Sequence, residues 1–546
     1  MHNIKLLPTI MLSGALALTG CAGSGIDSNK NADTLFTNGN IYAVDEANTQ
    51  AEAIAVKDGN IVYIGSLEGA NEYKGMETKI VDLDGKFTMP AFVDSHLHPL
   101  SNSYAALFQV ALFELTSKAQ YLAAIQTFAS TKSADEWIVG AGFDASVFGK
   151  QGPTKEVLDT ILPDRAIAIV DRDIHSMLVN SKALALMGIT KDTQDPVGGS
   201  IQRDANGNAT GLLIDDSAMN LARGFFPVAT KAEYKESLLW MQSQLNQQGI
   251  TTAHDAWVEF DENYYQAFDE LAKEGKLTVR YRGSWFVDPL GDVNEDIDYG
   301  IVLSQQFTHP HFQVNSFKFL TDNVLEQDSA LLLDEDGGIS GVRNWEQTDM
   351  TNAFSKVDKA GYQLHVHVVG DGGTRVTLDA LEEAERKNGS RDSRHSLAHV
   401  EVADLGDIDR MGVLGLTAHL TTIGLEEETD VFEDSASKFH PVKSLIDAGV
   451  NVAIASDYAT SDPDVMANIY GAMQRNNAEG AGLEEMLKAA TLNGAYANFL
   501  ESEVGSLEVG KKADFVVLSK DVLDIDTSEI PSVSIDMTYF EGKRVH

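Results

Sequence analysis

The chain has 546 residues, with 41 Lys and Arg against 82 Asp and Glu, and a formal net charge of −41. Hydrophobic residues make up 43% and charged residues 23%, a balance that excludes wholesale disorder and collagen-like or coiled-coil composition. The acidic balance also excludes nucleic acid as an expected partner, because binding to phosphates needs a basic face. A domain takes about 100–200 residues, so the length accommodates about three domains or one large barrel with additions.

The first 20 residues have the form of a secretory signal, with Lys5 near the start and an apolar stretch too short to span a bilayer. The segment LTGC, which ends at Cys21, resembles the bacterial lipoprotein box, in which the signal is removed and the cysteine is acylated. The alternative for Cys21 is an ordinary buried thiol. We expect residues 1–20 to be a signal peptide and residues 21–32 a flexible tether. Ala22 is typical of sorting to an outer membrane, which predicts an exported protein on the periplasmic side, anchored to the membrane through lipid alone.

Both ends of the mature chain have the pattern of short strands separated by turns. Residues 33–88 contain apolar or alternating runs between Asn-Gly, Asp-Gly and single-Gly breaks, and residues 500–546 repeat this pattern. Two β-rich ends on either side of a long α/β middle predict one small composite β-sandwich domain that is built from both ends of the chain.

The middle of the chain, residues 89–499, alternates strand-like and helical segments. The strand-like runs are FTMPAFVDSHLH, GITTAHDA, and residues 279–286, 314–322, 362–370, 396–401, 415–422 and 451–458. Eight strands in this alternating order predict an α/β fold, a (β/α)8 TIM barrel. Because the ~150 residues between the first two strands exceed an ordinary loop, we expect an inserted subdomain over about residues 101–230.

Candidate metal ligands fall near the carboxyl ends of these strands, where barrels of this kind carry their reactive groups. His96 and His98 are two residues apart in a strand, so both imidazoles can face one ion, although such a pair also arises by chance or as plain strand histidines. Four further residues lie at the ends of later strands: Lys318, His367, His399 and Asp457. This mixture of nitrogen and carboxylate ligands predicts zinc or another borderline divalent metal in preference to calcium or magnesium.

The motifs VDSHLHP, FKFLTDN, HVHVVGDGG, AHVE and ASDY, in this order, resemble the amidohydrolase superfamily. The resemblance covers nearly all of residues 33–546 and is strongest to the YtcJ-like branch that contains N-substituted formamide deformylases. It implies one or two divalent metal ions at the mouth of the barrel. His96 and His98 would hold the first ion, and His367 and His399 the second. Lys318 would bridge the ions once carbon dioxide has carboxylated its amine, and Asp457 would contact the metal-bound water.

The resemblance implies hydrolysis of an amide-like, non-peptide C–N bond of a small molecule by a metal-activated hydroxide. Asp457 can take the proton of the attacking water and return it to the leaving amine. A deaminase, lactonase or esterase with the same metal site is an alternative, because a fold does not select the bond. A second alternative is a non-catalytic lipoprotein that binds a small molecule. Self-association into a homo-oligomer is compatible with the sequence.

Three further residues are candidates for binding the substrate. His175 lies in the expected insertion, where the branch usually has Asp-Gly-His, and it either touches substrate or makes a structural hydrogen bond. His365 shares the inward face of His367, and it either lines the site, orients a ligand or packs as an ordinary histidine. Asp322 is matched in the family, although Asn323 replaces the usual glycine after it.

Overall fold

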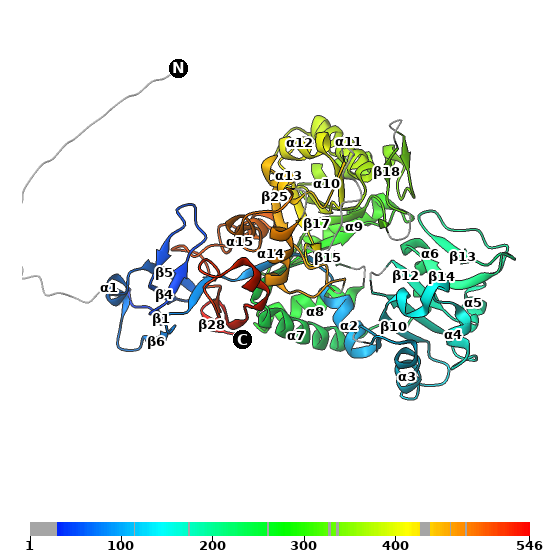
Figure 1. The fold of residues 1–546 in the computed structure, drawn as a ribbon, viewed down its shortest axis with the longest axis horizontal. Coiled ribbons are helices and arrows are strands. Elements are labelled where there is room, and N and C mark those ends of the chain that lie inside the picture. Colours follow the sequence, from blue (N-terminus) through cyan, green and yellow to red (C-terminus); the bar gives the residue numbers. More distant parts are fainter. Residues whose placement is uncertain are drawn as a thin grey trace, which may run out of the picture.

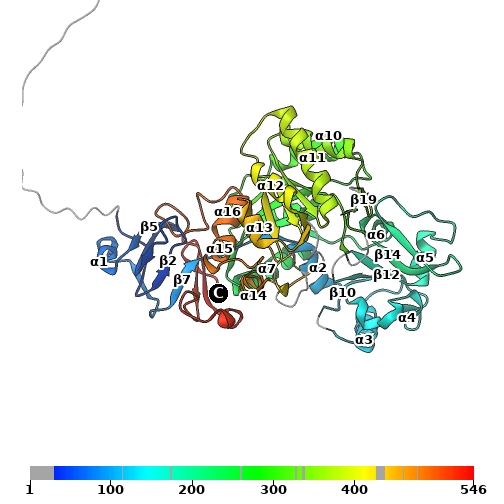
Figure 2. The ribbon, with the colours of Figure 1, turned by 45° about the horizontal axis from the view of Figure 1, so that its top comes forward.

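The computed structural model describes residues 30–113, 115–172, 175–258, 261–325, 329–334, 338–425, 437–458, 460–475 and 478–546. The expected signal peptide and Cys21 lie outside the described residues. Strands from both chain ends gather at one end of the molecule, the barrel lies in the middle, and the inserted subdomain lies at the other end (Figures 1 and 2). Within the described part of the chain, no helix is long and apolar enough to cross a membrane.

An eight-stranded parallel sheet forms the centre of the molecule and confirms the predicted α/β barrel. Its strands pair in chain order, and nearly all their residues are buried, as expected for parallel strands that are covered on both faces. The strands are β8 (Phe92–Leu97), β15 (Ile250–Val258), β16 (Arg280–Phe286), β17 (Phe312–Leu320), β20 (Gln363–Val368), β21 (Ser396–His399), β23 (Thr417–Leu420) and β25 (Asn451–Ile454).

The first and last barrel strands, β8 and β25, meet without forming a regular ladder. The Asp457 N–H donates to the His96 carbonyl at 2.8 Å, and the Ser95 hydroxyl donates to the Ile454 carbonyl at 2.7 Å. The Asp94 carboxylate also joins the two strand ends, since it accepts hydrogen bonds from the N–H and the hydroxyl of Ser456 at 3.1 and 2.5 Å. The barrel is therefore closed largely by polar groups that flank the predicted metal ligands.

Helices cover the barrel strands from outside (Figure 1). Among them, α7 begins with a capping box formed by Thr230 and Glu233, which satisfies its first N–H groups. The helices are α2 (Pro99–Phe108), α7 (Lys231–Gln247), α8 (Glu262–Lys273), α9 (Val293–Ser304), α10 (Gln347–Lys359), α11 (Asp371–Asn388), α12 (Leu405–Val413), α13 (Val442–Asp447), α14 (Val465–Gln474), α15 (Leu483–Ala489) and α16 (Leu492–Ala497).

The predicted first strand, FTMPAFVDSHLH, is two strands in the structure. Its first half, β7 (Phe87–Pro90), pairs with β2 (Asn40–Tyr42) and antiparallel with β26 (Phe515–Leu518), whereas only β8 enters the barrel. The apolar run is continuous because β7 and β8 are each buried at every position, so hydrophobicity gives no sign of the change of sheet. The Ala91 N–H, which donates to the Asp514 carbonyl, lies at the junction.

Two sheets are built from the chain ends. One contains β5 (Asn60–Gly65), β4 (Ala53–Lys57), β1 (Thr34–Thr37) and β6 (Lys79–Asp82) in that order. The other contains β28 (Lys543–Arg544), β27 (Ile535–Phe540), β26, β7, β2 and β3 (Gln50–Ala51), so it mixes strands from both ends. Phe36, Phe515 and Tyr539 pack between these sheets with ring centroids 4.5–5.0 Å apart.

A second α/β unit is inserted between β8 and β15. Its six-stranded sheet has the order β13 (Ser200–Arg203), β14 (Ala209–Ile214), β12 (Ser176–Val179), β11 (Ile167–Asp171), β10 (Ile138–Phe143) and β9 (Val110–Ala111). The helices α3 (Lys118–Ala129), α4 (Lys155–Asp159), α5 (Ser181–Met187) and α6 (Asp216–Arg223) accompany this sheet. It has hydrophobic clusters of its own, so the insertion folds around a separate core.

Candidate metal centre

The six predicted ligands come from five strands, and the structure places each near the carboxyl end of its strand. His96 lies on β8 and His98 just after it, Lys318 lies on β17, and His367 lies next to last on β20. His399 ends β21, and Asp457 lies three residues after β25. All six are buried or nearly so, with at most about an eighth of any of these imidazole or carboxylate side chains exposed.

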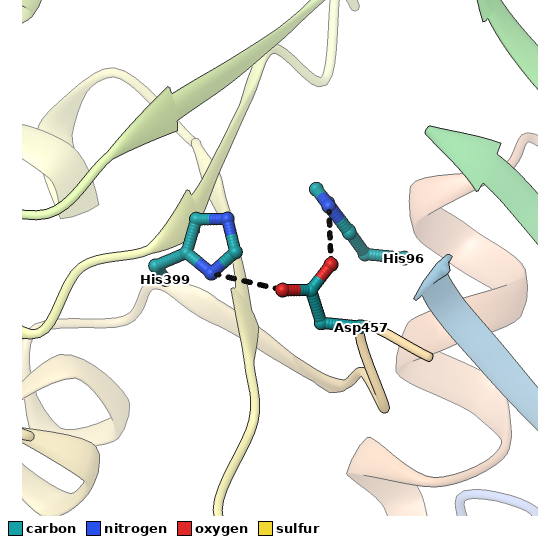
Figure 3. A group of neighbouring side chains, drawn as sticks. All are labelled: His96, His399 and Asp457. Carbon is teal, nitrogen blue, oxygen red and sulfur yellow. Dashed lines mark ion pairs between the residues drawn. The ribbon is translucent and has the colours of Figure 1, made fainter. Parts of the chain in front are cut away.

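His96, His399 and Asp457 form one group of potential ligands at the centre of this set (Figure 3). One ligand atom from each lies within 4.8 Å of the others. The His96 Nε2 is 3.3 Å from the Asp457 Oδ1, and the His399 Nδ1 is 3.9 Å from the Asp457 Oδ2. Both carboxylate oxygens thus face imidazole nitrogens, at separations that leave space for a cation between them.

The remaining two ligand histidines adjoin this group. The His98 Nε2 is 3.2 Å from the same Asp457 oxygen that faces His96. The rings of His367 and His399 are 4.4 Å apart between centroids and cross at 60°. The ring of His96 is 5.1 Å from that of His399 and 5.4 Å from that of His98, so the four imidazoles form one cluster around Asp457.

Lys318 is a buried cation beside these histidines. Its side chain is 2% exposed, and within the described ranges its Nζ has no hydrogen-bond or ion-pair partner. Burial lowers the pKa of Lys318 to about 8, a shift that the nearby Asp457 carboxylate partly opposes. An amine in this setting is disfavoured as a charged ammonium, which makes a neutral, nucleophilic amine accessible near neutral pH.

The backbone at two of the ligands is strained. His399 has φ of 76° and Asp457 has φ of 50°, the left-handed region that non-glycine residues rarely adopt. Such conformations cost about 1–3 kcal/mol each and concentrate at functional sites. His399 ends its strand and Asp457 follows its own by three residues, and the side chains of both lie in the shared cluster.

The polar atoms of this cluster fit a divalent cation. Among the described residues, the buried His367 Nε2 has no hydrogen-bond partner, and the buried His96 Nε2 and Asp457 Oδ1 face each other at 3.3 Å without a well-aligned hydrogen bond, which is costly unless another group satisfies them. Burial lowers the pKa of His399 to about 4 and the pKa of His96 well below its usual value. Burial alone would raise the pKa of Asp457, but the neighbouring His96 and His98 hold it well below its usual value. Neutral imidazoles and an ionised carboxylate are the states that bind a metal.

His365 lies behind His96 and defines which nitrogen of that ligand faces the centre. The His96 Nδ1 is 2.7 Å from the His365 Nε2, and the His365 Nδ1 is 3.3 Å from the Ser396 hydroxyl, which in turn reaches the Leu364 carbonyl at 3.4 Å. If the His96 Nε2 lone pair faces a cation, its Nδ1–H can donate to the His365 Nε2. The His365 Nδ1–H can then donate to the Ser396 hydroxyl, which donates to the Leu364 carbonyl. We name this series of hydrogen bonds the His96 relay.

Two more histidines sandwich His365. The rings of His254 and His419 stack on His365 with centroids 4.7 and 4.6 Å away and interplanar angles of 13° and 19°. His254 is bonded to Asn498 and Ser284, and the His419 Nδ1 lies 2.8 Å from the Ser95 hydroxyl. Both lie beneath the ligand cluster, so they hold the imidazole of His365 in place.

Of the three weaker candidates, only His175 lines the cavity in front of the ligands. Its ring is 5.6 Å from that of His367, and its Nδ1 is 3.4 Å from the Asp215 Oδ1. His365 lies behind His96, as described. Asp322 is fully buried and accepts from the N–H groups of Leu331, Val369 and Gly370 at 2.9–3.0 Å. His365 therefore contacts His96, and Asp322 binds backbone N–H groups. Neither of the two side chains lines the cavity.

The cavity has a volume of about 400 Å³ and opens onto His98, Lys318, His367, His399 and Asp457. This volume lies in the ~300–1,000 Å³ range of small-molecule sites. Sequence reasoning missed most of its lining, which comes from α2, the inserted sheet and the segment after β15. It also missed Asp94, although the period of two in VDSHLH places this residue on the same face as His96 and could have indicated it. Burial raises the pKa of Asp94 to about 6, although the hydrogen bonds from Ser456 act to lower it.

Comparisons with known proteins find relatives over nearly the whole chain. A model of the amidohydrolase family matches residues 79–546. The putative amidohydrolase YtcJ of Bacillus subtilis is 29% identical and aligns over 94% of this chain and 99% of its own length. N-substituted formamide deformylase of Arthrobacter pascens is 26% identical over 93% of this chain and 97% of that enzyme.

Solved structures share the fold. An uncharacterized metal-dependent hydrolase from Pyrococcus horikoshii, 22% identical, covers 91% of this chain and 99% of its own with a TM-score of 0.70. An adenosine deaminase from Xanthomonas campestris with bound zinc, 15% identical, covers 94% of this chain and 93% of its own with a TM-score of 0.56.

Proposed function

The chain belongs to the amidohydrolase family, and from this premise we propose that it hydrolyses an amide-like, non-peptide C–N bond of a small molecule. It is a metal-dependent hydrolase of the class that acts on C–N bonds. The observation that carries the proposal is the convergence of His96, His399 and Asp457, of which His399 and Asp457 line a small-molecule cavity. The likeness to N-substituted formamide deformylase supports an amide bond as the one cleaved.

We propose that His96, His98, His367, His399 and Asp457 hold one or two divalent cations, with zinc best suited to these nitrogen and carboxylate donors. When bound, the cation lowers the pKa of a coordinated water and polarises the scissile carbonyl. The solved deaminase of the same fold contains zinc, which is compatible with this choice.

Lys318 has the setting expected of a carboxylated lysine. Its neutral amine would attack carbon dioxide and release a proton, which replaces a buried cation by an anionic carbamate with two oxygens to share. The anion would then be satisfied by the cations that the histidines hold. This assignment explains why a lysine without a protein partner can be buried beside four imidazoles.

Asp457 is the proposed proton carrier. Its ionised carboxylate lies against the cavity, so it can accept the proton of the attacking water and donate it to the leaving nitrogen. Its left-handed backbone fixes the carboxylate toward the imidazoles, so the group that moves the proton does not have to reorganise.

Metal analysis and a substrate screen test the proposal together. Protein purified with zinc or manganese supplied should carry at least about one metal per chain, and His96→Asn should lower this content, whereas His309→Asn, a change outside the site, should leave it unchanged. Metal-loaded protein is then screened against N-formyl, N-acyl and cyclic amides, with esters, lactones and aminated heterocycles as controls. Turnover of esters or heterocycles alone would contradict an amide bond as the target.

We also propose that the protein is exported and anchored by lipid at Cys21, as the sequence LTGC indicates. Metabolic labelling with palmitate tests this. The native chain should take up label and fractionate with membranes, whereas Cys21→Ser should remain unlabelled, and equal labelling of both would contradict the assignment.

A further inference from the structure

His175 belongs to the inserted subdomain but reaches the cavity in front of the ligand cluster. It precedes β12, and its ring is 5.6 Å from that of the proposed ligand His367. Its Nδ1 faces the Asp215 carboxylate at 3.4 Å, whereas its Nε2 has no hydrogen-bond partner among the described residues. Because 14% of this side chain is exposed, the imidazole keeps one nitrogen available to a molecule in the cavity.

Asp215 has a conformation that its own helix does not explain. It is the residue before α6, where an aspartate usually accepts from the first N–H groups of the helix, yet its side chain makes no such bond. Its φ of 63° and ψ of 164° lie in a region almost confined to glycine. The buried carboxylate instead faces His175 and accepts from the Asn323 amide at 3.2 Å. The Asp215 N–H also donates to the His175 carbonyl at 2.8 Å, so backbone and side chain both hold the histidine.

Asn323 connects this pair to the barrel. It lies three residues after β17, the strand that carries Lys318, and it is 2% exposed. Its Nδ2 donates to the Asp215 Oδ2, and its Oδ1 accepts at 3.0 Å from the amide of Asn344, which lies shortly before α10. Both ends of the Asn323 amide are therefore engaged, one with the inserted subdomain and the other with the barrel.

The surroundings of this polar bridge hold it in place. The residue before Asn323 is Asp322, whose carboxylate accepts from three backbone N–H groups. A Cβ at Gly198, just before β13, would lie 2.7 Å from the Asn344 Oδ1, so the inserted subdomain packs closely against the bridge. The bridge therefore leaves the Asp215 carboxylate, and through it the His175 ring, little freedom to turn.

We propose that His175 binds the substrate through its Nε2, by a hydrogen bond to the amide group that is cleaved, and that Asp215 and Asn323 are positioning residues for it. The inserted subdomain has a core of its own, so the barrel strands that place the ligand cluster do not place this histidine. The bridge supplies the missing link between the two. The inference rests on the proposed function, since it names a further residue of the same site.

A double-mutant cycle tests the positioning role. With metal-loaded protein and N-butylformamide as the substrate, His175→Phe, which keeps an aromatic ring without a nitrogen, should lower kcat/KM by at least ~10-fold. Asn323→Gly should lower it by about 5-fold in the native protein but by less than about 2-fold when His175→Phe is already present, because it acts through the imidazole. Equal losses in both backgrounds would show that Asn323 supports only its own loop and would overturn the inference.

Metal analysis separates substrate binding from support of the ligands. Because neither His175 nor Asn323 is a proposed ligand, both variants should retain the zinc content of the native protein, whereas His367→Asn should lower it. Loss of zinc from His175→Phe would place the residue in metal binding and overturn the inference. Asn206→Gly, the same substitution in the exposed turn between β13 and β14, should leave both zinc content and kcat/KM unchanged.

Two further measurements keep this inference distinct from the proposed function. If the protein cleaves butyl formate but not N-butylformamide, the proposed function fails, and the same cycle measured on the ester still tests the roles of His175, Asp215 and Asn323. Hydrogen exchange tests the bridge without turnover. Asn323→Gly should speed exchange in peptides that cover residues 210–217 by at least ~3-fold, since the Asp215 N–H loses its fixed setting, and unchanged exchange would overturn the inference.

Discussion

Replacing His365 tests the His96 relay as the source of ligand orientation. His365→Ala removes the nitrogen that lies 2.7 Å from the His96 Nδ1, but it leaves all six proposed ligands in place. The freed Nδ1 is buried, and the His96 ring loses the contact that directs its Nε2 toward Asp457. The substitution should therefore lower the affinity for the metal indirectly, by releasing the orientation of His96.

The expected size of the effect follows from the role of such supporting contacts. Their loss typically costs 10–100-fold in metal affinity, which corresponds to about 1.4–2.7 kcal/mol. His365→Gln should recover much of this loss, because its amide reaches about as far as the imidazole and can accept from the His96 Nδ1–H through its oxygen. We therefore expect metal affinity to fall in the order native, His365→Gln, His365→Ala.

The assay is competition for zinc against a chelator of known affinity, which reports binding independently of turnover. His395→Asn is the matched control, because His395 is also a buried histidine of the same region but is bonded to Asp358 and the Leu364 N–H, away from the ligands. Urea unfolding of each variant measures the general cost of losing a buried imidazole. If His365→Ala binds zinc as tightly as the His395→Asn control, the relay does not orient His96 and the reasoning is refuted.

Three further predictions concern other parts of the protein. Asp457→Asn should keep most of the metal but lower kcat by ~100-fold or more, since the amide cannot carry the proton; steady-state kinetics with metal analysis measure both, and a fully active variant would contradict the assignment. Lys318→Ala should lose metal or activity and recover in part when short carboxylates are added, whereas two metals bound normally without additive would exclude Lys318 as the bridge. The hydrogen bond from His311 holds the pKa of Glu541 to about 2, against a usual value of about 4.5, so its contribution to stability is fully present above pH 4.5 and is lost as the pH falls toward 2. Glu541→Gln should lower the free energy of unfolding by about 1–2 kcal/mol at pH 7, after allowance for solvent screening, and by less at pH 3; an equal loss at both pH values in urea titrations would contradict this origin.

Several features of the fold could be predicted because they depend on local pattern. Strand and helix alternation between residues 89 and 499 follows from hydrophobic periodicity and from breaks at glycine, and it indicated the barrel. The same pattern could not show that residues 87–90 leave the barrel, since a strand buried in an outer sheet and a strand buried in a barrel have the same composition. Strand partners are decided by contacts between distant segments, such as β7 with β26.

The candidate site shows the same division. The grouping of the proposed ligand residues could be predicted because imidazoles, a lysine and a carboxylate at the ends of strands of one parallel barrel must meet at one edge of it. Orienting a ligand was one of the roles expected of His365, but its stacking between His254 and His419 could not be predicted, because the three histidines come from three strands that only the barrel brings together. Asp322 was expected at the substrate, yet its carboxylate is committed to three backbone N–H groups of later segments.

The sequence by itself determined the chemistry available to this protein: which side chains can hold a divalent cation, the order in which the strands present them, and the excess of acidic groups. The tertiary structure alone decided the position of each group relative to the cavity. Side chains hundreds of residues apart, such as His96 and Asp457, become neighbours through barrel closure, and the apolar wall opposite them comes from an inserted sheet. Local propensities act over a few residues, whereas the separation of two ligands across a closed barrel depends on the packing of every strand between them.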